Sequence, residues 1–348
     1  MYNKAGKGAA MRFGLFGSAQ ARRRDGDPAH GFRDYIDYAV EAEALGFVSA
    51  FLVEHHFTGI GQVSAPLGLL SWVAARTTRL RLGTAVMVLP WHNPVLLAEE
   101  AATLDLLSGG RLDFGVGKGY RHNEFSGFAM AIGEAEARFA EALEIILESW
   151  TASERFSHRG RFWRFDDIMV EPAPAQQPHP PLWMAAGSPA SIRAVAARGA
   201  NLLLDQFASV DATAERLAYF RAAVAAEGRA FDPGMVAVAR NIFVTENAAE
   251  TAAALERLRR QHAHMMALSQ HPGRQVASHI LSYAEAPGAS EAAALYGTPD
   301  MVVRELRRLE QAGVEYVLLN SGGTARENLR RFARHVMPEF SRAPASSP

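Results

Sequence analysis

Short apolar runs alternate with amphipathic stretches along most of the chain. Apolar runs of strand length, bounded by turn residues, predict β-strands, and apolar positions with a 3.6-residue period predict helices. Strands are predicted at 12–16, 47–53, 80–88, 111–116, 182–186, 201–205, 235–244 and 314–319. Helices are predicted at 32–45, 66–77, 94–107, 134–150, 189–198, 211–227, 248–264 and 326–336, and a further one begins at 298–299.

Eight strands that are each followed by a helix predict a closed (β/α)8 barrel rather than an open sheet. Such a barrel takes about 250 residues, and the chain has 348, which leaves room for two insertions. We expect one after the fourth strand, at about 155–181, and one after the seventh, at about 265–296. Residues 11–340 then form one domain, with an N-terminal extension at 1–10 that we expect to be disordered and a tail at 341–348.

The first insertion allows another interpretation. It ends in a proline-rich stretch, PAPAQQPHPP at 172–181, which cannot continue a helix and could link two domains. The alternation of strand and helix resumes directly at residue 182, which favours an insertion within one barrel.

Composition narrows the classes of function. Lys plus Arg total 36 against 37 for Asp plus Glu, so no broad electrostatic field attracts nucleic acid or anionic lipid. The chain has 0 cysteines, which excludes disulfides, thiolate nucleophiles and cysteine-rich metal sites. No stretch reaches the ~18 apolar residues of a membrane span. We expect a cytoplasmic protein with neither a nucleic-acid nor a membrane partner.

The loops that follow the strands of a (β/α)8 barrel meet at one end, where the chemistry of such folds is found. We therefore expect several polar or glycine-rich segments to face one mouth. They are His55-His56, 90–92, 117–120, 187–188 and 320–321.

The stretch GVGKGY at 115–120 follows the fourth strand. It lacks the Ser or Thr that a P-loop needs after its Lys, and no helix with a third packing glycine begins at once, as a dinucleotide fingerprint requires. Its backbone N–H groups and Lys118 still suit a phosphate, although a plain turn explains the glycines equally well.

A second turn of this kind follows the fifth strand. Ser188 stands before Pro189, where it would cap a helix whose N-terminus favours negative charge. Simple capping explains this motif when it is taken alone. Two such turns on one rim favour a ligand that carries a phosphate.

The stretch FLVEHHFTGIGQ at 51–62 closes the second strand with two adjacent histidines. Neighbouring residues of a strand point to opposite faces, so His55 and His56 should not meet on one metal ion, and no metal site is predicted. One buried, hydrogen-bonded histidine beside an exposed one, neither of them catalytic, would also explain the motif. Their place at the mouth favours proton transfer, because imidazole titrates near neutral pH.

Longer motifs resemble a known family. EHHFTGIGQVSAP, TTRLRLGTAVMVLPWHNPVLLAEEAATLDLLSGGRLDFGVGKGYRHNEFSGFA and GTPDMVVRELRRLEQAGVEYVLLN are similar to the bacterial-luciferase-like flavin-dependent oxidoreductases. The resemblance implies a (β/α)8 barrel that binds FMN at its mouth, the FMN being reduced by a separate flavin reductase. It implies a monooxygenase in which O2 adds to the flavin to give a C4a-peroxide, which oxidises a small organic substrate.

The same resemblance assigns roles to single residues. It places His55 beside the isoalloxazine ring, where it would transfer protons or stabilise the peroxide, with His56 as a second catalytic candidate. It implies a non-prolyl cis peptide under the ring, between Ala85 and Val86. The residues it implies for FMN binding are Thr84, Ala85, Val86, Lys118, Gly119, Tyr120, Ala186, Gly187, Ser188 and Ser191.

Two alternatives stay open at this point. One is an oxidoreductase of the same fold that uses the deazaflavin F420, transfers hydride and consumes no O2. The other is a non-catalytic flavin-binding protein. The segment 265–296 corresponds to a variable loop over the mouth, either a lid or a plain surface insertion. The family also implies a homodimer, for which apolar surface at 67–72 and 96–107 offers an interface.

Overall fold

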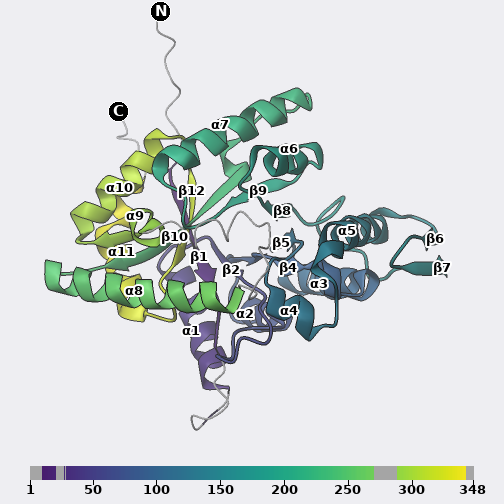
Figure 1. The fold of residues 1–348 in the computed structure, drawn as a ribbon, viewed down its shortest axis with the longest axis horizontal. Coiled ribbons are helices and arrows are strands. Elements are labelled where there is room, and N and C mark those ends of the chain that lie inside the picture. Colours follow the sequence, from purple (N-terminus) through teal and green to yellow (C-terminus); the bar gives the residue numbers. More distant parts are fainter. Residues whose placement is uncertain (1–9, 21–26, 28, 270–287, 342–348) are drawn as a thin grey trace, which may run out of the picture.

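Eight parallel strands close into a barrel in the computed structural model, which describes residues 10–20, 27, 29–269 and 288–341 (Figure 1). Each strand pairs with the next, and the last pairs with the first. The predicted (β/α)8 barrel is confirmed. Its strands are β1 (Arg12–Gly17), β2 (Ser49–Leu52), β3 (Arg81–Thr84), β5 (Leu112–Gly117), β8 (Leu182–Ala185), β9 (Asn201–Leu204), β10 (Val236–Val244) and β12 (Tyr316–Asn320).

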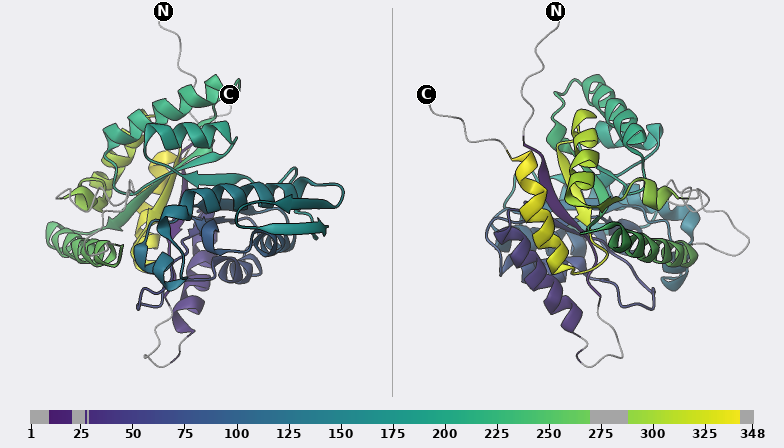
Figure 2. Two further views of the ribbon diagram at one scale, coloured as in Figure 1. Left: turned by 45° about the vertical axis from the view of Figure 1, so that its right-hand side comes forward. Right: turned by 90° about the vertical axis from the view of Figure 1, so that its left-hand side faces the viewer.

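Helices cover the outside of this barrel (Figure 2). Four of them begin at a proline, whose fixed φ and missing N–H suit the first helical turn. The long helices are α1 (His30–Ala44), α2 (Pro66–Ala74), α3 (Pro94–Ser108), α5 (Ala135–Thr151), α6 (Pro189–Ala197), α7 (Val210–Ala226), α8 (Ala248–Ser269), α10 (Pro299–Gln311) and α11 (Arg326–His335).

Two apolar clusters hold these layers together. The larger one packs the helices on the outside of the strands. The smaller one fills the interior of the barrel with Phe51, Trp183, Leu203, Ala237, Tyr316 and Leu318. The barrel is therefore a packed core, and only its open end can receive a ligand.

The third strand is shorter than the apolar run at 80–88 indicated. β3 ends at Thr84, and β4 (Met87–Val88) is a separate short strand that pairs with β5. The peptide bond between Ala85 and Val86 is cis, as the family resemblance implied. Hydrophobicity could not indicate this interruption, because the residues on both sides of it are equally apolar.

The first insertion is an antiparallel hairpin of β6 (Phe156–Arg159) and β7 (Arg164–Ile168). Its turn is held by the carboxylate of Glu141 in α5, which accepts hydrogen bonds from the backbone N–H groups of 161–163. The hairpin lies beside α5 at the edge of the molecule (Figures 1 and 2). From there the chain returns to the barrel at β8.

The second insertion begins with α8, which extends to Ser269 rather than to residue 264. Residues 270–287 of the expected lid lie outside the described residues, as do residues 1–9 and 342–348. The chain continues with α9 (Ala289–Ala292) and β11 (Leu295–Gly297), and β11 pairs in parallel with the end of β10.

Shorter elements shape the loops at the mouth and elsewhere. They are α4 (His122–Gly127) and the 3-10 helices η1 (Leu89–Trp91), η2 (Ile132–Glu134), η3 (Pro233–Met235) and η5 (Met337–Phe340). Within the described ranges, none of the helices has both the length and the hydropathy that crossing a membrane requires.

Candidate active site

The mouth of the barrel has a floor of apolar side chains, several of them small. Phe16, Ala85 and Val86 are partly exposed and pack on the apolar cluster inside the barrel. Ala185 is exposed where β8 ends. Gly117 lies against this floor, because a Cβ added to it would come within 2.5 Å of the Val86 side chain. The floor can therefore support a flat ring.

Close packing and backbone conformation explain the glycines of GVGKGY. A Cβ on Gly115 would lie 1.7 Å from the carbonyl oxygen of Thr84. The Thr84 hydroxyl donates to Gly115 O at 2.7 Å and accepts from Gly115 N at 2.9 Å. Gly119 has a φ of 75°, which a residue with a side chain rarely adopts. These glycines let β3 and β5 approach closely, and the Thr84 hydroxyl is engaged by the backbone.

Lys118 lies on the rim and is accessible. Its Nζ donates to Glu136 Oε2 at 2.8 Å, and both side chains are more than half exposed. A surface ion pair of this kind is weak, so a phosphate can displace the carboxylate. Tyr120 is partly exposed close to it.

The turn after β8 forms a capping box. Ser191 N donates to Ser188 Oγ at 3.3 Å, and Ser188 N donates to Ser191 Oγ at 3.1 Å. Ala186 and Gly187 precede it and are partly exposed. Both hydroxyls thus take part in capping α6, while the turn itself stays at the rim of the mouth.

The two adjacent histidines diverge, as strand geometry predicts. His55 Nδ1 lies 3.0 Å from Glu124 Oε1, whereas His56 Nε2 lies 2.8 Å from Glu54 Oε1. Glu124 Oε1 also accepts from the backbone N–H of His56 at 3.0 Å. Among the residues that the structure describes, no group of three or more His, Cys, Asp or Glu side chains is placed to hold a metal ion.

Glu54 is a buried hub between three segments. Its Oε1 accepts from His92 Nε2 at 2.7 Å and from Trp91 Nε1 at 2.9 Å, in addition to His56. Its Oε2 accepts from the backbone N–H of Val88 at 2.7 Å. Burial raises the pKa of the carboxyl, but the hydrogen bonds from His56 and His92 outweigh it and lower the pKa to about 2. Glu54 is therefore ionised and ties β2 to β4 and η1.

His55 has a different electrostatic setting. Burial lowers its pKa below the ordinary 6.5, the hydrogen bond to Glu124 opposes this shift, and the nearby charge of Arg121 adds to it. The imidazole is therefore neutral at pH 7. Since a carboxylate only accepts, Nδ1 carries the hydrogen, and Nε2 keeps the lone pair that can take a proton.

An aromatic wall stands beside the histidines. Phe128 stacks on Trp91 with ring centres 5.1 Å apart, and Phe125 contacts Trp91 edge-on at 5.3 Å. His56 and Phe57 pack edge-on against Phe128. Phe57 is 57% exposed, so part of this wall is open to a ligand.

Sequence reasoning missed Glu54, Glu124 and Arg121. Glu54 stands directly before the histidine pair, so its position at a strand end was an available signal. Glu124 and Arg121 lie in α4 or just before it, about 70 residues away in sequence. Only the closed barrel brings them to the end of β2.

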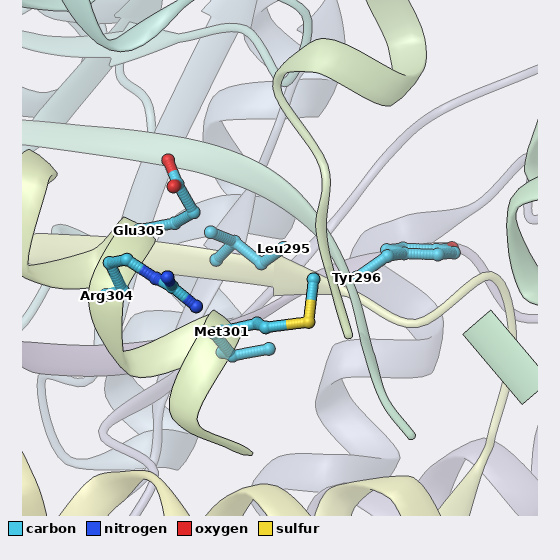
Figure 3. Close-up of a pocket in the computed structure, with 6 residues that line it drawn as sticks. Leu295, Tyr296, Met301, Arg304 and Glu305 are labelled. Carbon is cyan, nitrogen blue, oxygen red and sulfur yellow. The ribbon is translucent and has the colours of Figure 1, made fainter. Parts of the chain in front are cut away.

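A separate hollow of about 240 Å³ lies between β11 and α10 (Figure 3). Leu295 and Tyr296 line it from β11, and Met301, Val302, Arg304 and Glu305 from α10. None of the residues predicted to bind a cofactor lines it. The histidines, the apolar floor and the buried carboxylates lie instead at the mouth of the barrel, which makes it the candidate site.

The chain belongs to the luciferase-like monooxygenase family, whose model matches residues 11–316. The protein y4vJ of Sinorhizobium fredii is 32% identical over 261 residues, which cover 75% of this chain and 74% of that protein. The oxygenase component of the flavin-dependent trigonelline monooxygenase of Acinetobacter baylyi is 30% identical over 209 residues, covering 60% of this chain and 58% of that protein.

An F420-dependent glucose-6-phosphate dehydrogenase of Amycolatopsis mediterranei is 34% identical over 166 residues, covering 46% of this chain and 49% of that protein. Among solved structures, the monooxygenase RslO1 from Streptomyces bottropensis matches with a TM-score of 0.82 at 26% identity, covering 95% of this chain and 100% of that one. The other three proteins are monooxygenases or an F420-dependent enzyme, so the family identifies this chain as an oxidoreductase.

Proposed function

We propose that this protein is a flavin-dependent monooxygenase that uses reduced FMN, delivered by a separate flavin reductase, and O2 to oxidise a small organic substrate. The observation that carries the proposal is the His55–Glu124 pair at the end of β2. It gives a neutral imidazole with a free Nε2 at the mouth of the barrel, as proton transfer to or from a bound substrate requires.

The residues at the mouth fit FMN. Ala85, Val86 and Gly117 would support the ring, and Lys118 with the turn at 186–188 would bind the single phosphate. Bound reduced FMN would supply the electrons that activate O2. The flavin-dependent trigonelline monooxygenase among the relatives supports a flavin as the cofactor.

Within this proposal His55 and His56 have different tasks. His55 holds or moves a proton at Nε2, and Glu124 fixes the tautomer that leaves this atom basic. The Nε2 atom of His56 is hydrogen-bonded to Glu54. We assign His56 to positioning the loops around the mouth, with a smaller effect on the reaction.

The aromatic wall and the small residues of the floor exclude water from the reacting groups. A dry site strengthens each hydrogen bond within it and suppresses side reactions with water. The substrate then contacts Phe57 and its neighbours on one side and His55 on the other.

The test is a comparison of cofactors with an isotopic readout. The purified protein is titrated anaerobically with reduced FMN and, separately, with reduced F420. A panel of small organic compounds is then added together with ¹⁸O2, and products are analysed by mass spectrometry. We expect FMN-dependent incorporation of one ¹⁸O atom. Oxidation that depends on F420 and incorporates no ¹⁸O would establish the hydride-transfer alternative, and FMN binding without any product would favour a non-catalytic protein.

We also propose that the protein is a homodimer. Trp72 of α2 and Leu96, Leu106 and Leu107 of α3 are exposed large apolar side chains, with 68% of Trp72 and 75% of Leu107 accessible. α2 and α3 contact each other, so these side chains lie on adjoining helices. Exposed apolar area of this kind is typical of a self-association surface, and a second copy of the chain is the occupant that we propose.

A further inference from the structure

Unpartnered polar atoms occur on two residues at the start of α4, beside the candidate active site. Seven buried side-chain nitrogen and oxygen atoms lack a hydrogen-bond partner among the residues that the structure describes. Four of them belong to Arg121 and Asn123: Nε and Nη1 of the first, Nδ2 and Oδ1 of the second. Buried donors and acceptors are normally paired, so unpartnered ones beside a candidate site point to a ligand that pairs with them.

Arg121 is the more consequential of the two because it carries a charge. Its side chain is 1% exposed, and its Nη1 lies 3.9 Å from Glu124 Oε1, too far for a hydrogen bond. That oxygen already accepts from His55 Nδ1 and from the backbone N–H of His56, which uses both of its lone pairs. The guanidinium is therefore close to the carboxylate without being satisfied by it.

A buried guanidinium with free donors calls for an acceptor that carries negative charge. Arginine has five N–H donors and no acceptor, and its planar fork matches the two oxygens of a carboxylate. Glu124 lies 3.9 Å away and balances the charge but leaves Nε and Nη1 without an acceptor, and a carboxylate bonds such donors more strongly than water does. Lys118, on the rim, already provides for a phosphate, whereas Arg121 shares a carboxylate with His55.

The surroundings indicate what the rest of such a ligand looks like. The ring of Tyr120 lies 5.8 Å from the Arg121 guanidinium, and Phe125, four residues along, belongs to the aromatic wall. A planar apolar body suits these neighbours. We propose that Arg121 binds the carboxylate of a planar organic acid and thereby holds the substrate next to His55. This assignment of a substrate class rests on the proposed oxygenase function.

The test measures equilibrium binding rather than turnover. Benzoate and its neutral counterpart benzamide are titrated by calorimetry into the full-length protein, with and without FMN. The variants are Arg121→Gln, Arg121→Lys and, as a charge-matched control, Arg198→Gln, because Arg198 is exposed at the far end of α6. Melting temperature and FMN affinity are recorded for each protein.

We expect the parent protein and Arg198→Gln to bind benzoate at least about tenfold more tightly than benzamide, the scale of a hydrogen-bonded charge. Arg121→Gln should lose this preference and keep its FMN affinity. Arg121→Lys keeps the charge but not the fork, so its preference should be intermediate.

Three results would overturn the assignment: no preference for benzoate in the parent protein, a preference that survives in Arg121→Gln, or a loss of FMN affinity in Arg121→Gln equal to the loss of benzoate. A lower melting temperature in both Arg121 variants with an unchanged preference would show that the residue is structural. Failure of the parent protein to bind FMN while it prefers benzoate would count against the oxygenase function alone.

Discussion

At the scale of single residues, two buried carboxylates give two neighbouring histidines different chemistry. Glu124 bonds Nδ1 of His55 and leaves its Nε2 free, whereas Glu54 takes Nε2 of His56. The residue types are the same, and only the bonded nitrogen differs. A sequence can place both histidines at a strand end, but it cannot say which ring atom is free.

The pH dependence of His55 follows from its burial. Because its pKa is lowered below 6.5, the neutral form persists below that pH, and the acid limb of an activity that needs Nε2 as a base should lie below 6.5. In the unfolded chain the residue binds its proton first, so its contribution to stability rises with pH across this window. Glu124→Gln removes a carboxylate that raises the pKa of His55, so the acid limb of the activity profile should move to still lower pH.

The measurement for this residue is a titration of the His55 imidazole by long-range ¹H–¹⁵N NMR, paired with the pH profile of turnover. His55→Gln identifies the resonance. A midpoint above 6.5, or an upward shift in Glu124→Gln, would mean that the electrostatic account of the pair is mistaken.

Lys118 should decide which flavin binds. Lys118→Ala should weaken FMN binding by roughly 1 to 3 kcal/mol, the scale of a charge-assisted hydrogen bond. Glu136→Gln should strengthen it, because the carboxylate that holds Lys118 Nζ at 2.8 Å no longer competes with the phosphate. Fluorescence titration with FMN and FAD measures both effects. An affinity for FAD equal to that for FMN, or an FMN affinity unchanged by Glu136→Gln, would show that Lys118 is not part of the phosphate site.

At the scale of elements, Glu54 connects the end of β2 with β4 and η1. In Glu54→Gln the new amide N–H would face one of the groups that donate to Glu54. The substitution would also remove the negative charge that strengthens the remaining hydrogen bonds. We expect the free energy of unfolding to fall by about 3 kcal/mol, as for a broken buried ion pair. Glu154→Gln, at an exposed position shortly after α5, is the control and should change little.

Unfolding at low pH should show the same stabilising effect of Glu54. The pKa of Glu54 is lowered to about 2 from the ordinary 4.5, so its stabilising effect is complete above 4.5 and is lost as the pH falls toward 2. Denaturant unfolding between those values should be less steeply pH-dependent in Glu54→Gln than in the parent protein. Identical pH slopes would show that Glu54 does not stabilise the fold in this way.

Periodicity indicated the barrel strands and most of the helices, because each buries one continuous apolar face. It overextended the third strand, since the residues on both sides of the Ala85–Val86 bond are apolar. It did not indicate α4, whose six residues are too few to show a helical period. The glycines of 115–119 were assigned to phosphate or to a turn, and the structure adds a packing reason: Gly115 lies against the Thr84 backbone and Gly117 against the Val86 side chain.

At the scale of the whole molecule, closure of the barrel assembles the candidate site. β2 and β5 are separated by β3 in the sheet, and their following loops meet over its end through Glu124 and His55. Positions 54–56 could be placed at the mouth from sequence, but their partners at 121–124 could not. Such contacts depend on how the barrel closes, which no local sequence pattern indicates.

The homodimer is the prediction that concerns the outer surface. Sedimentation at micromolar concentration should give a dimer for the parent protein and a monomer for Trp72→Glu and Leu107→Glu, because a charge at either position opposes burial of the apolar patch on α2 and α3. Met169→Glu, which alters an exposed apolar side chain next to β7, is the control. A monomeric parent protein, or a dimer that both substitutions leave intact, would refute this interface.

The central claim is that His55 moves the proton in an FMN-dependent oxygenation, and single-turnover product formation tests it most directly. Reduced FMN bound to the parent protein, His55→Ala or His56→Ala is mixed with ¹⁸O2 and the substrate found in the isotopic screen. His55→Ala should keep its FMN affinity and melting temperature while product formation falls by ~10² or more, the usual effect of losing an acid–base group, and His56→Ala should lose less. Undiminished product formation by folded, FMN-loaded His55→Ala would contradict the account.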